Sequence, residues 1–303
     1  MNWFHVVVAA ERIEVPALPV RAFRKGDFVK VGPGTLKKMK IAVAQISCTP
    51  GEVSANLRKI RDFAAQGKEA GAEMIVFPEM SDTGYSMTAI REKATGWSEG
   101  AVPELRKIAH DLGLTIISGV SEKVGESIYN SQVVINGAGE IVTRYRKTHL
   151  FAPVGEDKCC TPGQELVSFT EGDWRFGLTI CYDLRFPEIY RALAVEQEVN
   201  VFIVSSAWPF PRVEHLRILA LARAIENQSY LVLSNRVGKD DGARFCGGST
   251  IIDPAGIVRA AASPDREELV VAELSPAVVK AVRDKMDVFA HRRPELYQEG
   301  SRR

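Results

Sequence analysis

The sequence has few cysteines, no long apolar run and almost no excess charge, and each deficit argues against a class of protein. Its five cysteines are scattered through 303 residues without a C-x-x-C pair, so we expect no disulfide framework and a reducing compartment, the cytoplasm. The longest apolar stretches, such as residues 200–207, fall far short of the roughly 20 residues that span a bilayer, so no membrane partner is expected. With 39 basic and 38 acidic residues, the chain has no electrostatic reason to bind nucleic acid.

What is present is the composition of a large globular protein, with 46% hydrophobic and 25% charged residues. Residues 1–38 differ from the rest, because they carry seven basic and three acidic residues and only one short apolar run, residues 4–10. The basic residues follow this run, whereas a signal peptide carries its positive charge before it. We therefore predict a poorly integrated N-terminal arm over residues 1–38 and one domain over residues 39–303.

Regular hydrophobic patterns begin at Lys40. Residues 40–45 alternate like a strand, and residues 53–63 place their apolar side chains on one face of a helix. Strand and helix patterns then alternate to the end of the chain, in two similar halves that each finish in a hairpin. This alternation is typical of the α/β class, and the two halves predict two stacked sheets with helices outside.

Three apolar strands each end at a side chain that can carry chemistry, namely Glu79, Lys147 and Cys181. Strand ends in α/β folds are rigid and open to a crevice, so a substrate can reach them. The Cys181 thiol precedes a helix that opens with proline, and the free N–H groups of such a turn favour a thiolate. Taken alone, however, a buried cysteine is more often structural.

The other two residues have alternative interpretations. Glu79 ends an apolar strand, where burial raises the pKa of a carboxyl group toward neutrality, but a capping or ion-pairing glutamate is an equal alternative. Lys147 belongs to a basic run, residues 144–147, that is most often a solvated face. If Lys147 points inward, its ammonium can pair with Glu79 and stabilise an oxyanion.

The three motifs together resemble the nitrilase superfamily of carbon–nitrogen hydrolases. FPEM contains Glu79, YRKTHLF contains Lys147 and LTICYDLRFPE contains Cys181, in the order and spacing of that superfamily over about residues 39–297. The resemblance implies a four-layer α-β-β-α sandwich with a Cys-Glu-Lys triad. It also implies that Glu156 is a second catalytic glutamate and that the backbone N–H of Tyr182 contributes to an oxyanion hole.

Within the superfamily, the CYDLRFPE, NRVG and HRRPELY segments look like the amidase branch that includes ω-amidases. The resemblance therefore implies hydrolysis of a small amide through a cysteine thioester, with release of ammonia, no cofactor, and assembly into a homodimer or larger homo-oligomer. The alternatives are an N-carbamoyl amino acid hydrolase, a nitrilase, or a catalytically silent binding protein on the same fold.

The sequence does not select the substrate, although it offers candidates for contacting one. These substrate-binding candidates are Tyr85, Asn130, Arg185, Ala207 and Trp208. Arg212 is a further cation that could hold an acidic substrate. His149 stays open as a partner of a catalytic cysteine or as a structural residue, and the adjacent pair Cys159 and Cys160 lacks a usual zinc spacing, so no metal site is expected.

Overall fold

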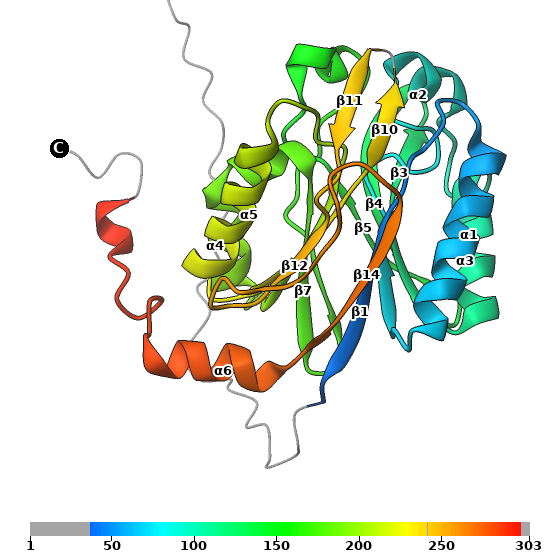
Figure 1. Cartoon of the computed structure of the whole chain (residues 1–303). Coiled ribbons are helices and arrows are strands. Elements are labelled where there is room, and N and C mark those ends of the chain that lie inside the picture. Colours follow the sequence, from blue (N-terminus) through cyan, green and yellow to red (C-terminus); the bar gives the residue numbers. More distant parts are fainter. Residues whose placement is uncertain (1–36, 241, 298–303) are drawn as a thin grey trace, which may run out of the picture. The chain divides into compact units, whose positions relative to one another are not determined.

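The computed structural model describes residues 37–240 and 242–297, all within one compact unit of the chain. Two six-stranded sheets lie face to face in this unit, and helices cover their outer faces (Figure 1). This is the four-layer α-β-β-α arrangement expected from the sequence. The arm expected over residues 1–38 lies, except for its last two residues, outside the described residues.

The first sheet has the strand order β14-β1-β2-β3-β4-β5. Its three central strands are parallel, and the remaining neighbours pair antiparallel. The strands are β1 (Met39–Gln45), β2 (Met74–Val76), β3 (Thr115–Val124), β4 (Ser127–Ile135), β5 (Ile141–Arg146) and β14 (Glu268–Leu274).

The second sheet has the strand order β13-β12-β9-β8-β7-β6, again with three parallel strands in the middle. Its strands are β6 (Ser168–Glu171), β7 (Trp174–Ile180), β8 (Val201–Ser206), β9 (Tyr230–Asn235), β12 (Thr250–Ile252) and β13 (Val258–Ala261). A separate two-stranded ribbon consists of β10 (Val237–Asp240) and β11 (Ala243–Cys246).

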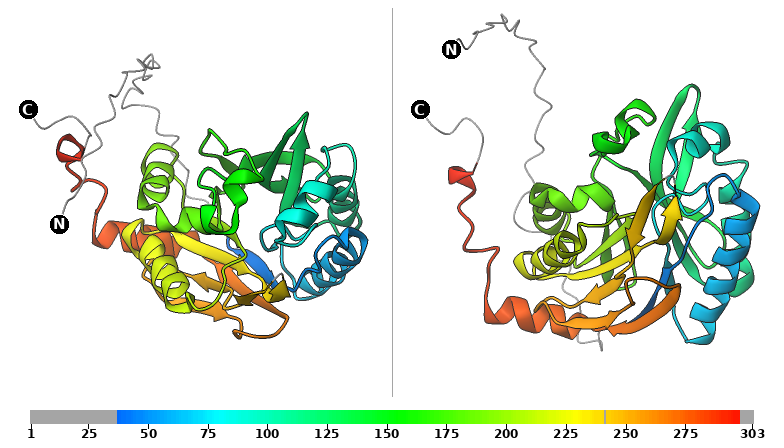
Figure 2. Two further views of the ribbon diagram at one scale, coloured as in Figure 1. Left: turned by 90° about the horizontal axis from the view of Figure 1, so that it is seen from above. Right: turned by 45° about the horizontal axis from the view of Figure 1, so that its top comes forward.

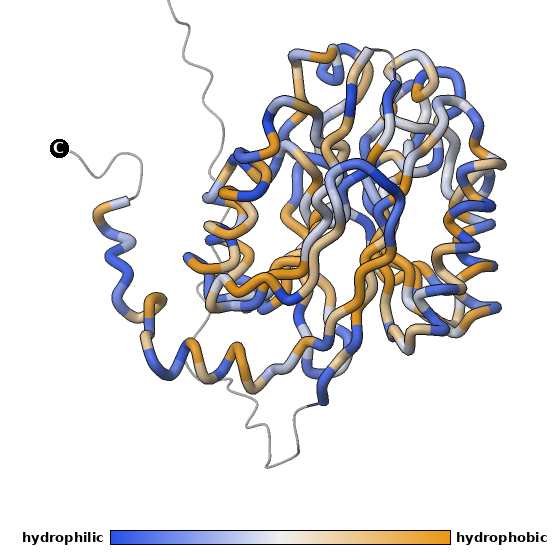
Figure 3. The backbone as a smooth tube through the Cα atoms, in the orientation of Figure 1, coloured by the Kyte–Doolittle hydropathy of each residue, from blue (hydrophilic) through white to orange (hydrophobic). Residues whose placement is uncertain are grey.

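The helices divide between the two sheets (Figure 2). The first sheet is covered by α1 (Val53–Glu69) and α3 (Ala101–Leu112), and the second by α4 (Pro187–Glu196) and α5 (Val213–Glu226). The shorter helices are α2 (Met87–Lys93) and α6 (Pro276–Lys285). Hydrophilic and hydrophobic residues alternate along α1 and α3, as expected for helices with one face on a sheet (Figure 3). None of the helices in the described part of the chain is long and apolar enough to cross a bilayer.

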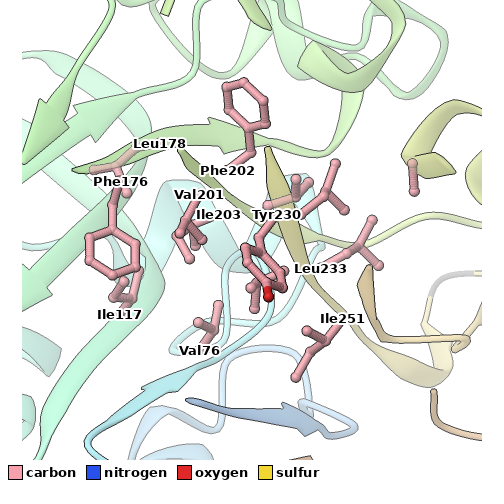
Figure 4. Close-up of a cluster of buried hydrophobic side chains, with 14 of the residues drawn as sticks. Val76, Ile117, Phe176, Leu178, Val201, Phe202, Ile203, Tyr230, Leu233 and Ile251 are labelled. Atoms are coloured by element: carbon pink, nitrogen blue, oxygen red, sulfur yellow. The ribbon is translucent and has the colours of Figure 1, made fainter. Parts of the chain in front are cut away.

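The largest core fills the space between the two sheets and extends to α4 and α5 (Figure 4). The pleat of strand β2 directs alternate side chains to two cores. Met74 and Val76 join this core, while Ile75, between them, joins a second core under α1 and α3. Phe176 and Leu178 of β7 meet the first sheet from the other side. Since β2 and β7 are buried on both faces, their ends are held rigidly.

The two halves of the sequence do not form one sheet each. The last strand, β14, leaves the second half and pairs with β1, in a register that places Val43 opposite Val270. Alternation within residues 268–274 shows that they form a strand, but the sheet that receives them depends on a long-range pairing that local pattern does not encode.

Candidate active site

Cys181 follows β7 directly and begins a 3-10 turn, residues 181–185. Its φ of 44° is a left-handed conformation that a non-glycine residue rarely adopts. The turn places Cys181, which is only 7% exposed, at the wall of a cavity of about 370 Å³. A thiol that the sequence predicted at a strand end therefore reaches open space through a strained turn.

Glu79 lies three residues beyond β2 and has no solvent exposure. Its backbone passes so close to β3 that a Cβ on Gly119 would lie 2.6 Å from the Glu79 Cα and 2.5 Å from the Pro78 carbonyl oxygen. Only glycine fits at this position. The Glu79 carboxylate accepts a hydrogen bond of 2.8 Å from the Ala207 backbone N–H, which connects it to the loop after β8.

Lys147 follows β5 directly and points inward, with no exposed surface. Its Nζ lies 2.8 Å from Glu79 Oε1 and 2.8 Å from Glu156 Oε2. Glu156, also fully buried, accepts further hydrogen bonds from the Tyr85 hydroxyl at 3.1 Å and the Phe151 N–H at 2.7 Å. The structure thus brings Lys147 and Glu156, nine residues apart in the sequence, together with Glu79, which lies 68 residues from Lys147.

The buried cluster perturbs the protonation of its members. Burial raises the pKa of Cys181 well above its ordinary value, and the Glu79 carboxylate raises it further, while Lys147 opposes them. Burial also raises the pKa of Glu79, against the opposing effect of Lys147. Burial alone lowers the pKa of Lys147, but Glu156 and Glu79 outweigh it, so this lysine is an ammonium. The resting site therefore holds a neutral thiol beside groups that can take its proton.

Asp183 ties the lysine segment to the cysteine turn, and our sequence analysis did not select it as a site residue. Its fully buried carboxylate accepts hydrogen bonds from the Ile180 N–H at 2.9 Å, the Tyr145 hydroxyl at 2.8 Å and the His149 N–H at 3.1 Å. The His149 ring also contacts Asp183, at 3.0 Å, and stacks on Phe186. An acidic residue two positions after a strand-end cysteine was the available sequence clue, because Asp favours such turns.

The residues that line the cavity beside Cys181 include five aromatic residues, two arginines and one acidic residue, Asp240. Four of the five predicted substrate-binding residues line it, namely Tyr85, Arg185, Ala207 and Trp208. Tyr182, whose N–H is the predicted oxyanion donor, lines it as well. Asn130 does not line it and instead contacts Glu79 and Glu156. Phe151 and Phe245 also line the cavity and were not predicted to do so, because their positions depend on long-range packing.

Two arginines bring positive charge to this cavity. The Arg185 guanidinium lies 4.7 Å from the centre of the Trp208 ring, and the Arg212 guanidinium lies 5.7 Å from that of Phe151. Within residues 37–240 and 242–297, neither forms an ion pair with a carboxylate. In the same ranges, no three His, Cys, Asp or Glu side chains are grouped to hold a metal ion.

Comparison with known proteins identifies the family. The carbon-nitrogen hydrolase family model matches residues 40–284. The chain belongs to the carbon–nitrogen hydrolase family. It is 34% identical over 262 residues to 2-oxoglutaramate amidase of Bacillus subtilis, covering 86% of this chain and 100% of that relative. It is 32% identical over 261 residues to omega-amidase YafV of Yersinia enterocolitica, covering 84% and 96% of the two chains.

Solved structures of this family share the fold. An amidase from Nesterenkonia sp. AN1, in a mutant form bound to acrylamide, superposes with a TM-score of 0.78 at 28% identity, over 88% of this chain and 98% of that one. Another mutant of the same amidase carries the acetamide moiety of fluoroacetamide on its active-site cysteine, with a TM-score of 0.77 at 28% identity over 86% and 95% of the two chains. The family, the fold and the enzyme class expected from the sequence are confirmed.

Proposed function

We propose that this chain hydrolyses the amide bond of a small ω-amide, with Cys181 as nucleophile and with Glu79, Lys147 and Glu156 as its catalytic partners. The observation that carries the proposal is the buried cluster in which Lys147 holds both carboxylates at 2.8 Å, within electrostatic reach of the Cys181 thiol at the cavity wall. Burying three charged side chains costs desolvation free energy. A role in moving protons within a water-poor cavity is a physical reason for a protein to keep such a cluster.

The proton path follows from the pKa directions. The Cys181 thiol is neutral at rest because its pKa is raised, so its proton passes to Glu79 as Sγ bonds to the amide carbon. Glu79, whose own pKa is raised by burial, then gives this proton to the departing nitrogen, and ammonia leaves. Water next attacks the thioester and gives its proton to Glu79. The C–S bond of the tetrahedral adduct then breaks, the carboxylic acid leaves, and Glu79 returns the proton to Sγ, which restores the resting thiol without a cofactor.

The negative charge that develops on the carbonyl oxygen needs donors. The Lys147 ammonium and the backbone N–H of Tyr182 are the groups that we assign to this role. Glu156 holds the ammonium through both of its oxygens, at 3.0 and 2.8 Å, and so fixes the direction of Lys147. Fixed donors of this kind stabilise a transition state more than mobile ones, because they do not reorganise during the reaction.

The cavity favours an amide that carries a carboxylate at its other end. Arg185 and Arg212 line the wall without a carboxylate partner among the described residues, and the about 370 Å³ available suits a substrate of few atoms. The Bacillus subtilis and Yersinia enterocolitica relatives are named for amides of this type. We therefore propose short ω-amides, such as the deaminated analogues of glutamine and asparagine, as substrates.

The decisive experiment measures ammonia released from a panel of substrates. The panel contains ω-amides with and without the distal carboxylate, an aromatic amide, a nitrile and an N-carbamoyl amino acid, because a Pyrococcus abyssi relative of 34% identity is named a nitrilase. We expect the highest kcat/KM for the carboxylate-bearing ω-amides. Preference for another class would change the substrate assignment. Release from none, by a folded sample, would favour a silent binding protein.

The nucleophile is tested separately. Cys181→Ala and Cys181→Ser should abolish turnover and keep the fold, because the sulfur that forms the thioester is lost while each substitution changes a single side-chain atom at the cavity wall. Mass spectrometry of the wild-type protein during turnover should place the acyl group on Cys181. An acyl adduct on any of the other four cysteines would refute the assignment.

We further propose that residues 39–303 form the hydrolase domain, that the enzyme works in the cytoplasm, and that it assembles as a homodimer or larger homo-oligomer. The support for assembly is a set of large apolar side chains that are about half exposed on and beside α5, namely Ile218, Ile225, Ile257 and Val258. Light scattering after gel filtration measures the mass, and a monomer at all concentrations would contradict the assembly.

A further inference from the structure

Asn130 bridges the two buried glutamates and does not line the cavity. Its Nδ2 donates a hydrogen bond of 2.7 Å to Glu79 Oε1 and another of 2.6 Å to Glu156 Oε1. The side chain comes from β4 and is 1% exposed. Asn130 therefore acts on the carboxylates from the protein interior rather than as a wall of the cavity.

The orientation of the Asn130 amide is fixed by charge. The reverse orientation would place the Oδ1 lone pairs against two carboxylates, which is repulsive. In the orientation present, Oδ1 is buried without a hydrogen-bond partner among the described residues, while Nδ2 makes two charge-assisted bonds. Such bonds are about twice as strong as neutral ones, so the bridge outweighs the unpaired acceptor. The backbone carbonyl of Asn130 also accepts the Lys147 N–H at 2.8 Å, which fixes the lysine beside it.

The two glutamates depend on Asn130 to different degrees. Glu156 Oε1 and Oε2 both bond to the Lys147 ammonium, and Oε2 has the Tyr85 hydroxyl and the Phe151 N–H besides. Among the described residues, the donors to Glu79 are Lys147 and Asn130 on Oε1 and the Ala207 N–H on Oε2. Without Asn130, Glu79 would keep one donor on each oxygen. Loss of the Asn130 hydrogen bonds should therefore affect Glu79 more than Glu156.

We propose that Asn130 is a positioning residue that orients Glu79 and favours its ionised form, so that Glu79 is ready to accept the Cys181 proton. The inference rests on the proposed function, in which Glu79 is that acceptor. One ammonium faces two carboxylates here, so a neutral donor that serves both supplies stabilisation that Lys147 alone does not. The bond from Asn130 also lowers the pKa of Glu79 against the dominant effect of burial, which raises it.

Four titratable groups face Glu79 from the surrounding elements, and they too affect the pH profiles that test the proposal. They are Lys147 after β5, Glu156 in its 3-10 turn, Cys181 after β7 and the Tyr85 hydroxyl before α2. Because these groups are coupled, the acidic limb of a pH profile belongs to the whole cluster. A substitution at Asn130 leaves all four side chains in place. A shift of the acidic limb in that variant is therefore due to loss of the Asn130 hydrogen bond.

The test compares Asn130→Leu with wild type by two pH profiles. One profile is kcat/KM for a carboxylate-bearing ω-amide, and the other is the rate at which iodoacetamide alkylates Cys181, followed by mass spectrometry of its peptide. Both rates fall as Glu79 becomes protonated. Loss of the donor should therefore move both acidic limbs to higher pH, by about one pH unit. On the alkaline plateau KM should stay within about twofold of wild type, because Asn130 does not line the cavity.

Gln132→Leu is the matched control. Gln132 lies two residues along β4, is fully buried, donates one hydrogen bond of 2.7 Å to Ser205 and leaves its own Oε1 without a partner among the described residues. This variant removes the same kind of amide from the same strand without touching the carboxylates. We expect it to lower thermal stability while both acidic limbs stay in place.

Each result decides the inference. Unmoved limbs, or limbs that move equally in Gln132→Leu, would overturn it, and an unmoved limb with a raised KM would show that Asn130 contacts substrate. If Asn130→Leu does not fold, Asn130→Ala decides by the same profiles, because its methyl group donates no hydrogen bond to either carboxylate. If no amide releases ammonia but the alkylation limb still moves, the proposed function fails and the role of Asn130 toward Glu79 stands.

Discussion

Two buried glutamates, Glu79 after β2 and Glu122 in β3, are contacted by neighbouring residues of the same two segments, β4 and the end of β5. At β4, Asn130 donates to Glu79 and the next residue, Ser131, donates to Glu122 at 2.7 Å. At the end of β5, Arg146 pairs with Glu122 and the next residue, Lys147, pairs with Glu79. Successive side chains point to opposite faces of a strand, so each pair is split between the two glutamates.

The same alternation gives the two carboxylates opposite character. Burial alone raises the pKa of Glu122, but hydrogen bonds from Arg146, Trp97 and Ser131 outweigh it, so the pKa is lowered and the group stays ionised. Burial raises the pKa of Glu79, and a second carboxylate, Glu156, shares the one ammonium that pairs with Glu79 in the described part of the chain. A glutamate with ample donors serves structure, whereas one that shares its cation can exchange a proton. Three substitutions test this contrast, in order of decreasing effect.

Lys147→Met should have the largest effect, because it leaves two buried carboxylates without a cation. We expect the free energy of unfolding to fall by about 3–5 kcal/mol at neutral pH and kcat/KM to fall by ~10² or more, since an oxyanion donor is lost. Denaturant titration and steady-state kinetics measure both. A variant as stable as wild type would mean that the ammonium is not what keeps the two carboxylates buried.

Glu79→Gln should lower kcat/KM by ~10² or more, because the proton acceptor is gone. Stability should not fall, since Lys147 keeps Glu156. A carboxyl group whose folded pKa is raised contributes stability below its unfolded pKa and loses it as pH rises through the folded value. The variant should therefore become more stable relative to wild type as pH rises above about 4.3. An unchanged rate would show that Glu79 is structural.

Glu122→Gln should have the smallest effect on activity, within about threefold. Its partners Ser131 and Arg146 point to the strand faces opposite to those of Asn130 and Lys147, so the catalytic cluster is not touched. Stability should fall by about 2 kcal/mol at neutral pH, since Arg146 loses a charged partner. A lowered folded pKa contributes stability above the unfolded value that disappears as pH falls through the folded value. The difference from wild type should thus vanish in acid. A loss of activity as large as that of Glu79→Gln would break the contrast.

Much of the site could be predicted from the chain, because strand ends are visible in local patterns. Glu79, Lys147 and Cys181 each stand where an apolar run stops, and Glu156 follows by resemblance. The basic run, residues 144–147, shows a limit of prediction from local sequence pattern. Its pattern favoured a solvated face, yet Lys147 is fully buried, and only the presence of two carboxylates from other segments makes that burial possible.

Asn130 and Asp183 show a second limit. Asn130 was predicted to bind substrate, whereas its amide bridges two glutamates 51 and 26 residues away in the sequence. Asp183 received no role, although it joins the lysine segment to the cysteine turn across a separation of 38 residues. Hydrogen bonds between distant segments leave no periodic trace in a sequence, so neither role was visible.

The sequence by itself determined which segments are strands and helices, because hydrophobic periodicity and turn residues act over short distances. It also placed a thiol, a carboxyl and an amine at strand ends. Only the tertiary structure decided that β14 joins the first sheet, that one lysine serves two carboxylates and that the cavity is walled by arginines on aromatic rings. The physical reason is that sheet register, burial and shared hydrogen bonds arise between segments far apart in the chain, and these long-range contacts set the protonation of each group.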